Sequence, residues 1–304
     1  MKYFLIAFAF IPLLAFAQVK LVVLGTVQDG GSPHIGCEKK CCEALFENPD
    51  PNRMVVSFGL INESTKKKFI FEATPDFSRQ LEILKSNCSF ETSAIPNGIF
   101  LTHAHIGHYT GLMYLGREAK GASNVPVYAM PKMKTFLETN GPWSQLVELQ
   151  NIKLRSLTNK VPLQLAEDLA IIPFKVPHRD EYSETVGFKF IGPNKSALFI
   201  PDIDKWEKWW VDIIQEIEKV DFAFLDATFF DAEEIGYRDI KEIPHPFVIE
   251  SMKYFERLNE KEKSKVYFIH FNHTNPLLNL NSSANKIAED KGFNVAKFGE
   301  IFEL

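Results

Sequence analysis

Short apolar runs, rich in valine, isoleucine and phenylalanine, recur along the chain and are typical of β-strands. We expect strands within the following segments: 19–26, 55–62, 68–74, 98–104, 125–130, 169–178, 185–192, 196–202, 221–229, 265–271 and 295–304. Stretches between them predict helices at 76–86, 110–119, 131–139, 205–219, 246–260 and 282–291. Early strands follow one another as hairpins, whereas later strands alternate with helices. The pattern predicts two sheets covered by helices, in one α/β domain.

The first 17 residues differ from the rest of the chain. Lys2 precedes an apolar run, and Ala15-Phe16-Ala17 matches the small-x-small pattern of a cleavage site. The run is too short to span a bilayer, so we expect a secretory signal peptide at 1–17 and one mature domain at 18–304. No later stretch is long enough to span a membrane, which predicts a periplasmic or secreted protein. The alternatives are an uncleaved anchor and a buried first strand.

The amino-acid composition agrees with the predicted globular domain. Hydrophobic residues make up 45% and charged residues 24% of the 304 positions, which is ordinary for a globular protein. The formal net charge of −5 predicts no broad basic surface, so nucleic acid is not favoured as a partner. The sequence leaves open whether the chain forms a homodimer.

Candidate chemistry is concentrated in LTHAHIGHYTG, residues 101–111, which holds His103, His105 and His108. Alternate residues of an extended chain face the same side, so the first two histidines can share one metal ion. His108 follows at the start of the next helix and turns back toward the same pocket. Imidazole ligands suit zinc or iron, so this stretch predicts a metal centre.

The motif resembles the H-x-H-x-D-H signature of the metallo-β-lactamase fold superfamily. The resemblance implies an αββα sandwich whose remaining ligands follow later strands, and His178, Asp202 and His270 occur in that order. The implied first site consists of His103, His105 and His178, and the implied second site of His108 and His270, with Asp202 bridging both.

Gly107 departs from the signature, because related sequences of this fold hold an aspartate there. The second site is therefore expected to lack one carboxylate and to bind its ion more weakly. Three protein ligands plus solvent still form an open catalytic site. We expect one or two zinc ions in this pocket, with iron or manganese as alternatives. We also expect the backbone to accept Gly107→Asp.

Two branches of the superfamily are similar to this chain. DGGSPHIGC (29–37), DATFFDAEE (226–234) and YFIHFNHTNPLLN (267–279) resemble the pyrroloquinoline-quinone biosynthesis protein B family, which implies a non-heme iron oxidoreductase. The full histidine motif and Asp202 resemble the phosphodiesterase and tRNase Z branch, which implies a metal-dependent hydrolase of phosphodiester or other ester bonds. Export argues against a biosynthetic role on a cytoplasmic precursor, so an exported hydrolase is favoured. A binding protein with a degenerate site is a third alternative.

GCEKKCC, residues 36–42, places Cys37, Cys41 and Cys42 within six positions. Three close thiolates suit a structural zinc site that lacks one ligand, whereas a disulfide between adjacent cysteines would be strained. Resemblance to phosphodiesterases of phosphonate degradation implies His273 as the fourth ligand, with His34 as a competitor. A disulfide or free thiols remain the alternative.

FLDAT, residues 224–228, resembles the H-E-A-T string of the phosphodiesterase branch, with Asp226 in place of the glutamate. His245 resembles the histidine that follows that string. In that branch the pair helps to protonate a phosphate leaving group, and a carboxylate holding an imidazole is a sound general-acid arrangement. Asp226 and His245 are therefore the candidate catalytic pair; the alternative is a strand-end cap and a turn histidine.

The cleavage pattern generates a direct prediction. N-terminal sequencing of the exported protein should begin at Gln18, immediately after Ala17. Soluble protein that is retained inside the cell with Met1 intact would contradict the expected export.

Overall fold

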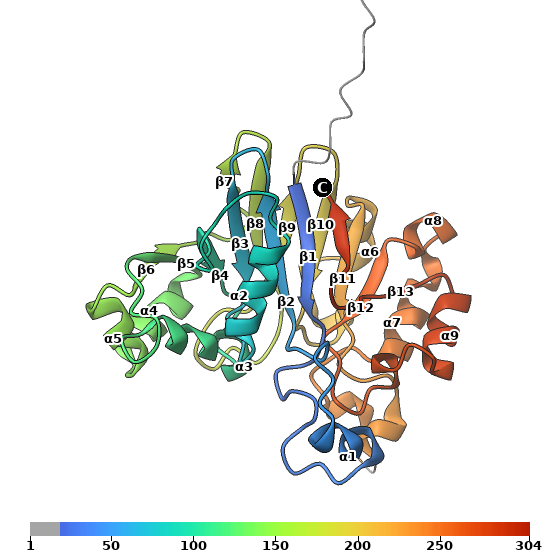
Figure 1. Cartoon of the computed structure of the whole chain (residues 1–304). Coiled ribbons are helices and arrows are strands. Elements are labelled where there is room, and N and C mark those ends of the chain that lie inside the picture. Colours follow the sequence, from blue (N-terminus) through green and yellow to red (C-terminus); the bar gives the residue numbers. More distant parts are fainter. Residues whose placement is uncertain (1–18, 237) are drawn as a thin grey trace, which may run out of the picture.

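The computed structural model describes residues 19–236 and 238–304, so the expected signal peptide lies outside the described residues. Two mixed β-sheets pack face to face, and helices cover their outer faces (Figure 1). This arrangement confirms the predicted αββα sandwich. Among the described residues, no helix is long and apolar enough to cross a membrane.

The first sheet has the strand order β14-β1-β2-β3-β4-β5-β6. Its strands are β1 (Val19–Gly25), β2 (Ser57–Asn62), β3 (Lys67–Phe71), β4 (Gly98–Phe100), β5 (Val125–Ala129), β6 (Ile152–Ser156) and β14 (Ile301–Glu303). The pairs from β14 to β3 are antiparallel, as expected for hairpins, and those from β3 to β6 are parallel. On this side of the molecule lie α2 (Phe77–Ser86), α3 (Ile106–Tyr109), α4 (Pro131–Thr139) and α5 (Trp143–Glu148).

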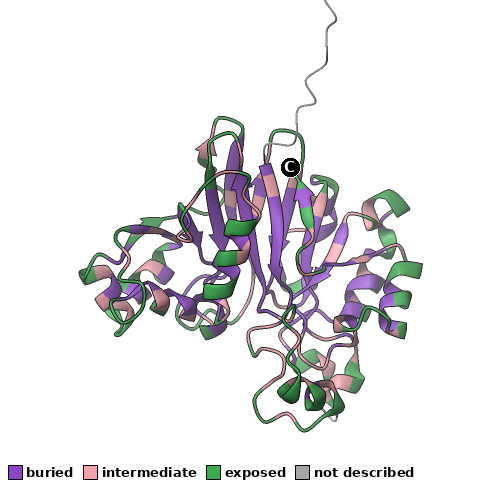
Figure 2. Cartoon of the chain, viewed as in Figure 1, coloured by how far each residue is buried: buried purple, intermediate pink, exposed green. Residues whose placement is uncertain are grey.

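The second sheet has the order β13-β12-β11-β10-β9-β8-β7. Its strands are β7 (Leu163–Ala166), β8 (Leu169–Lys175), β9 (Val186–Ile191), β10 (Ser196–Ile200), β11 (Phe222–Asp226), β12 (Val266–Ile269) and β13 (Asn294–Val295). The helices on this side are α6 (Ile213–Glu218), α7 (Val248–Tyr254), α8 (Glu260–Lys263) and α9 (Ser283–Asp290). The sheets are buried, and the exposed residues lie mainly on helices and loops (Figure 2).

Phenylalanine side chains fill the space between the sheets. Phe58 on β2 makes edge-to-face contacts with Phe199 and Phe224 of the opposite sheet, at ring-centroid distances of 4.8 and 4.7 Å. Phe71 on β3 contacts Phe188 in the same way at 5.2 Å. All five side chains are buried. Such pairs add about 0.5–1.5 kcal/mol each beyond the burial of area, so this layer fixes the two sheets against each other.

The strand directions gather the candidate residues at one edge. In the first sheet β1, β3 and β4 run in one direction, and in the second sheet β8, β10, β11 and β12 share a direction. The loops after these strands meet at the lower edge of the sandwich in Figure 1, next to α1 (Lys40–Glu47). Ligands of open α/β sheets bind at the carboxyl ends of strands, so this edge is the expected place for a site.

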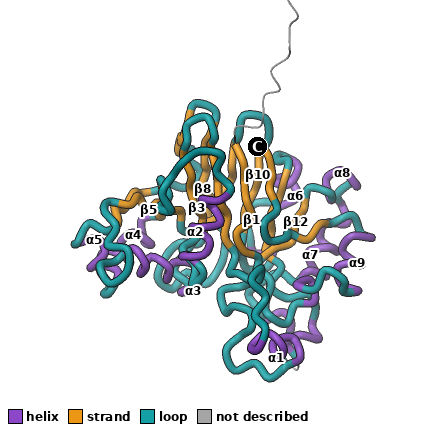
Figure 3. Tube along the Cα trace, in the orientation of Figure 1, coloured by secondary structure: helices purple, strands orange, loops and turns teal. Residues whose placement is uncertain are grey.

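Several predicted elements differ from those observed. The expected helix 205–219 is a 3₁₀ turn at Trp206–Lys208 followed by α6, and the helix expected at 110–119 is a 3₁₀ helix at Thr110–Leu115. The last predicted strand is two short strands, β13 and β14, that belong to different sheets. Elements that were not predicted include the helices α1 and α5 (Figure 3) and the strands β6 and β7.

Candidate metal centre

Four predicted ligands form a first group at the carboxyl edge: His103, His105, His178 and Asp202. Nε2 of His103 lies 3.2 Å from one carboxylate oxygen of Asp202, and Nε2 of His178 lies 3.2 Å from the other. Nδ1 of His105 lies 2.8 Å from the same nitrogen of His103. One atom from each of the four side chains therefore faces a common point, where three nitrogens and an oxygen can hold one ion.

Local structure explains how the two histidines of the H-x-H motif come together. The chain leaves β4 in an extended conformation that continues to His105, which precedes α3 with φ −80° and ψ 137°. Oγ1 of Thr102 lies 2.8 Å from Nδ1 of His103, which turns Nε2 toward the ligand group. A fixed partner on the second ring nitrogen is the usual way in which a protein orients a histidine ligand.

His108 is fully buried in α3 and faces three carboxylates. Its Nδ1 lies 3.5 Å from Oε1 of Glu72, and its Nε2 lies 3.9 Å from Oδ2 of Asp202. Burial lowers the pKa of His108, but the negative charges of Glu72, Asp29 and Asp202 outweigh this effect and raise the pKa to about 9. The surroundings of His108 therefore favour a positive charge, either a proton or a metal ion.

His270 follows β12 and is also fully buried. Its backbone has φ 69°, a left-handed conformation that a side chain other than glycine adopts at a cost of about 1–3 kcal/mol. Its Nδ1 lies 2.9 Å from Oγ1 of Thr228. Among the described residues, the buried Nε2 atoms of His270 and His108 have no hydrogen-bond partner. These two nitrogens are therefore free to bind an ion.

Asp202 is 3% exposed and touches most of the histidines. Burial raises the pKa of its carboxyl group, but the charges of His178 and His245 and the hydrogen bond from His103 bring it well below the usual range. Burial and the charge of His108 lower the pKa of His103 well below its ordinary value. An ionised carboxylate beside a neutral imidazole is the donor set that a divalent metal requires.

The predicted catalytic pair is also formed. Nδ1 of His245 lies 2.9 Å from Oδ2 of Asp226. The carboxylate of Asp226 also accepts hydrogen bonds from the backbone N–H groups of Ile203 and Thr228, at 3.1 and 2.9 Å, and from the Thr228 hydroxyl at 2.7 Å. Asp226 and His245 also form a group with Asp202 and His270, in which the ligand atoms lie within 4.8 Å of one another. Because four donors already surround the Asp226 carboxylate, we assign it to holding the His245 ring.

The pKa of His245 differs from its ordinary value. Burial lowers this pKa, but the adjacent carboxylates of Asp226 and Asp202 outweigh burial and raise it to about 9. An imidazole in these surroundings retains its proton at neutral pH.

A separate cluster joins the predicted cysteines to the chain after β12. One atom each from Cys37, Cys41, Cys42 and His273 lies within 4.8 Å of every other. The sulfur of Cys41 is 3.9 Å from that of Cys37 and 3.9 Å from that of Cys42, far beyond bonding distance. Two thiolates bound tetrahedrally to zinc at ~2.3 Å are about 3.8 Å apart, so the observed separations fit a zinc site.

His34, the competing fourth ligand, lies outside this cluster. Its ring stacks on that of His273 at a centroid distance of 4.4 Å, and its Nδ1 lies 2.9 Å from the carbonyl oxygen of Ile35. These positions favour His273 over His34 as the fourth ligand.

Burial and the neighbouring thiols raise the pKa of Cys41 to about 12, so three thiolates need a cation to coexist here.

The expectation that position 107 accepts an aspartate is wrong, because space is lacking although the backbone φ is not positive. A Cβ atom added to Gly107 would lie 2.1 Å from Cβ of Asp29 and 2.8 Å from its Cα. Asp29 follows β1 in a different part of the sequence, and the histidine motif carries no signal for it. One atom of its carboxylate lies within 4.8 Å of ligand atoms of His108 and His270. Asp29 thus occupies the space that a side chain at position 107 would need.

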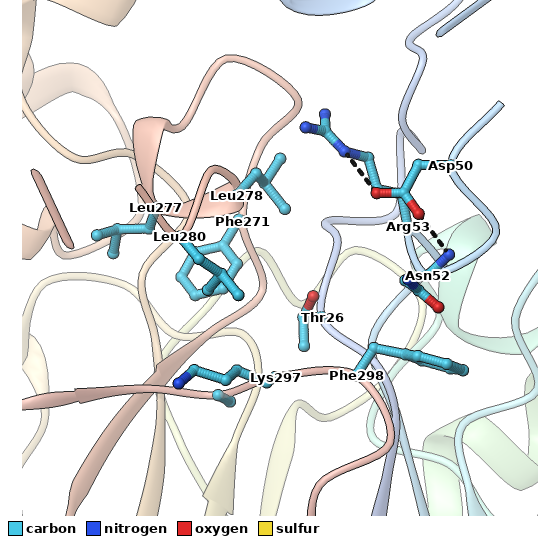
Figure 4. Close-up of a pocket in the computed structure, with 11 residues that line it drawn as sticks. Thr26, Asp50, Asn52, Arg53, Phe271, Leu277, Leu278, Leu280, Lys297 and Phe298 are labelled. Carbon is cyan, nitrogen blue, oxygen red and sulfur yellow. Dashed lines mark hydrogen bonds and ion pairs between the residues drawn. The ribbon is translucent and has the colours of Figure 1, made fainter. Parts of the chain in front are cut away.

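A cavity of about 220 Å³ lies beside the loops of the carboxyl edge (Figure 4). Leu277, Leu278 and Leu280 line one side, and Asp50, Asn52 and Arg53 line the other. None of the candidate metal ligands lines it. A different hollow of about 430 Å³ includes Glu181, whose carboxylate lies 3.3 Å from Nε2 of His105. No candidate metal ligand lines this hollow either, and Glu181 is its contact with the metal centre.

Two packed sheets with a histidine and aspartate centre at their carboxyl edge define the class of this protein. Residues 67–271 match the model of the Beta-lactamase superfamily domain, and the chain belongs to this family. The metallo-β-lactamase resemblance of the histidine motif is thereby confirmed. A metal cofactor is in keeping with the family and with the clustered ligands.

Individual relatives show which members of the family are similar to this chain over its whole length. The chain is 25% identical to coenzyme PQQ synthesis protein B of Gluconobacter oxydans, over 94% of this chain and 99% of that one. It is 24% identical to the protein of the same name from Acinetobacter baumannii, over 93% and 99%. These matches confirm the resemblance to the biosynthesis protein B family.

Solved structures show the same fold. Zinc-bound PqqB from Methylobacterium extorquens superposes with a TM-score of 0.74 at 19% identity, over 94% of this chain and all of that one. A diphosphatase from the PhnP family superposes with a TM-score of 0.65 at 24% identity, over 94% and 97% of the two chains.

The cysteine cluster generates a prediction. Cys37→Ser and His273→Ala should each remove one zinc ion per chain and lower the melting temperature, because binding at such sites is coupled to folding. Cys88→Ser is the matched control, because Cys88 lies outside the cluster. Elemental analysis and thermal unfolding provide the readouts. Variants at positions 37 and 273 that keep full zinc content and stability would show that the cluster holds no metal.

Proposed function

We propose that this chain is an exported metal-dependent hydrolase that cleaves a phosphodiester or another ester bond of a small molecule. The observation that carries the proposal is the arrangement of two ligand groups around Asp202, with the Asp226–His245 pair beside them. The fold similarity to a diphosphatase supports hydrolysis, and the N-terminal cleavage pattern supports export.

Zinc is the metal that these ligands suit best, because zinc sites consist of three or four side chains such as imidazoles and carboxylates, and the ligand groups here have that size. The zinc-bound relative supports the same choice. Zinc in such a site acts as a Lewis acid and supplies hydroxide at neutral pH, by lowering the pKa of water to ~7. The proposed ligands of one ion are His103, His105, His178 and Asp202, and those of the other include His108 and His270, with Asp202 shared.

The remaining side chains position these ligands and move a proton. Thr102 and Thr228 hold the outer nitrogens of two ligands, His103 and His270. The ring of His245 is held through Nδ1 by Asp226, and its other nitrogen, Nε2, can carry the proton that a departing alkoxide needs. The pair therefore acts as the general acid of the reaction.

Charge at the rim also suits an anionic substrate. Arg179 follows the ligand His178 directly, and its positive charge acts on both His245 and Glu181. A cation in this position attracts a phosphate group toward the metal centre. The hollow that begins at Glu181 and includes Tyr182 and Lys132 has room for the rest of a small substrate.

One observation favours a second candidate function. Relatives named coenzyme PQQ synthesis protein B match 94% of this chain, and two histidines with a carboxylate can also bind non-heme iron. An oxidoreductase role is therefore the alternative. Elemental analysis after aerobic and anaerobic purification distinguishes the two, since redox-active iron in the pocket favours oxidation and zinc favours hydrolysis.

The hydrolase proposal predicts that Asp202→Asn abolishes activity while Asp204→Asn preserves it. Asp202 is shared by the proposed ligand groups, whereas the partly buried Asp204 pairs with the exposed Lys208. Loss of an outer-shell partner of a metal ligand costs about 10–100-fold, so loss of a shared ligand should cost at least about 100-fold. The assay is hydrolysis of bis(p-nitrophenyl) phosphate by zinc-loaded protein. Equal activity in the two variants would refute the proposal.

The general-acid role of His245 predicts a dependence on the leaving group. His245→Gln should lower turnover of a phosphodiester with an alkoxide leaving group by about 10²–10⁴-fold. A p-nitrophenolate leaving group departs without a proton, so turnover of that substrate should fall much less. Steady-state rates of the variant on both substrates provide the test. An equal loss on both would assign His245 a purely structural role.

A further inference from the structure

We propose that Asp29 is a ligand of the second metal ion, replacing from the loop after β1 the carboxylate that the histidine motif lacks at position 107. The inference rests on the proposed two-ion site and names the side chain that completes it. It changes the expectation that the second ion is bound by His108, Asp202 and His270 alone.

The first step concerns the position of the Asp29 carboxylate. A ligand atom of Asp29 lies within 4.8 Å of ligand atoms of His108 and His270. Both histidines are fully buried, and their Nε2 atoms have no hydrogen-bond partner among the described residues. Buried nitrogens without a partner are costly, so they indicate a binding partner that completes the site. A carboxylate opposite two such nitrogens forms three corners of a zinc site.

The second step concerns the glycine. Gly107 lies in α3 and its φ is not positive, so no unusual backbone conformation requires a glycine there. Space requires it instead, because an added Cβ would overlap Cβ of Asp29 at 2.1 Å. A side chain at position 107 and Asp29 in its present place therefore exclude each other. A glycine at position 107 and an aspartate at position 29 therefore go together in this structure.

The third step concerns what holds Asp29. The backbone N–H of Gln28 donates to the carbonyl oxygen of Phe271 at 2.8 Å, and the N–H of Phe271 donates to Thr26 at 2.8 Å. These bonds tie the residues just before Asp29 to the residue just after His270. Beyond Asp29, the same loop enters the cysteine cluster, which includes His273. The loop is thus fastened on both sides of Asp29 to the segment that carries His270.

The charge of the site follows from this assignment. With Asp29 and the shared Asp202, two carboxylates would act on the second divalent ion, which offsets more of its charge than Asp202 alone. The second ion is therefore bound more firmly than three ligands with one carboxylate would allow.

The test measures metal content as well as activity. Mature protein is loaded with zinc, dialysed against a competing chelator and analysed for zinc per chain. Asp29→Asn keeps the shape of the side chain and should lower the affinity of one ion by at least about 10-fold. Asp290→Asn, at the exposed end of α9, is the matched control and should retain every ion. Visible spectra of cobalt-substituted protein report the same loss independently of turnover.

A second experiment moves the carboxylate from position 29 to position 107. Gly107→Asp alone should lose the second ion, because its side chain displaces the Asp29 loop. Asp29→Gly combined with Gly107→Asp removes the closest overlap and should regain at least part of the second-ion occupancy, since the carboxylate then comes from α3. If Gly107→Asp alone keeps full occupancy, or Asp29→Asn binds zinc like the control, the assignment of Asp29 is wrong.

These outcomes separate the two claims. Wild-type protein that holds two ions in the pocket, together with an Asp29→Asn variant that also holds two, overturns the ligand assignment and leaves the hydrolase proposal standing. Wild-type protein that holds zinc only in the cysteine cluster overturns both.

Discussion

The structure depends on one buried negative charge. Asp202 lies at the carboxyl edge of the second sheet with 3% of its surface exposed, where an isolated carboxylate is strongly unfavourable. Histidines from both sheets surround it, at 3.2 Å in the case of His103 and His178. Positive charge at this point, from metal ions or protons, offsets the cost of burial. The ligands from the two sheets thereby depend on one another.

The rest of the fold makes such a centre rigid. The phenylalanine layer around Phe58 fixes the two sheets, and the strand directions then bring loops from seven strands to one edge. Outer partners hold the rings: Thr102 for His103, Thr228 for His270 and Asp226 for His245. The proposed zinc cluster of the cysteines and His273 fastens the loop that carries Asp29. A preorganised centre of this kind loses little entropy when it binds an ion or a substrate.

The sequence predicted the sandwich and the clustered histidines because both depend on local patterns. Alternation within the extended chain brought His103 and His105 together, whereas Asp202 and His270 were implied by the resemblance to the metallo-β-lactamase superfamily. The contact between Asp29 and Gly107 was missed, because it joins a loop to α3, 78 residues away, without any shared spacing. The helix predicted at 205–219 is interrupted in the structure, and the strand predicted at 295–304 is divided between two sheets. Tertiary packing overrode local propensity in each case.

The central claim is that Asp202 lies between two metal ions. Diffraction at the zinc absorption edge from crystals of metal-loaded protein tests it most directly. The account predicts two anomalous peaks about 3.5–4 Å apart on either side of the Asp202 carboxylate, the spacing of two-metal sites. A third peak should lie among the three cysteines and His273. A single peak in the histidine pocket, or a pair that does not flank Asp202, would contradict the account.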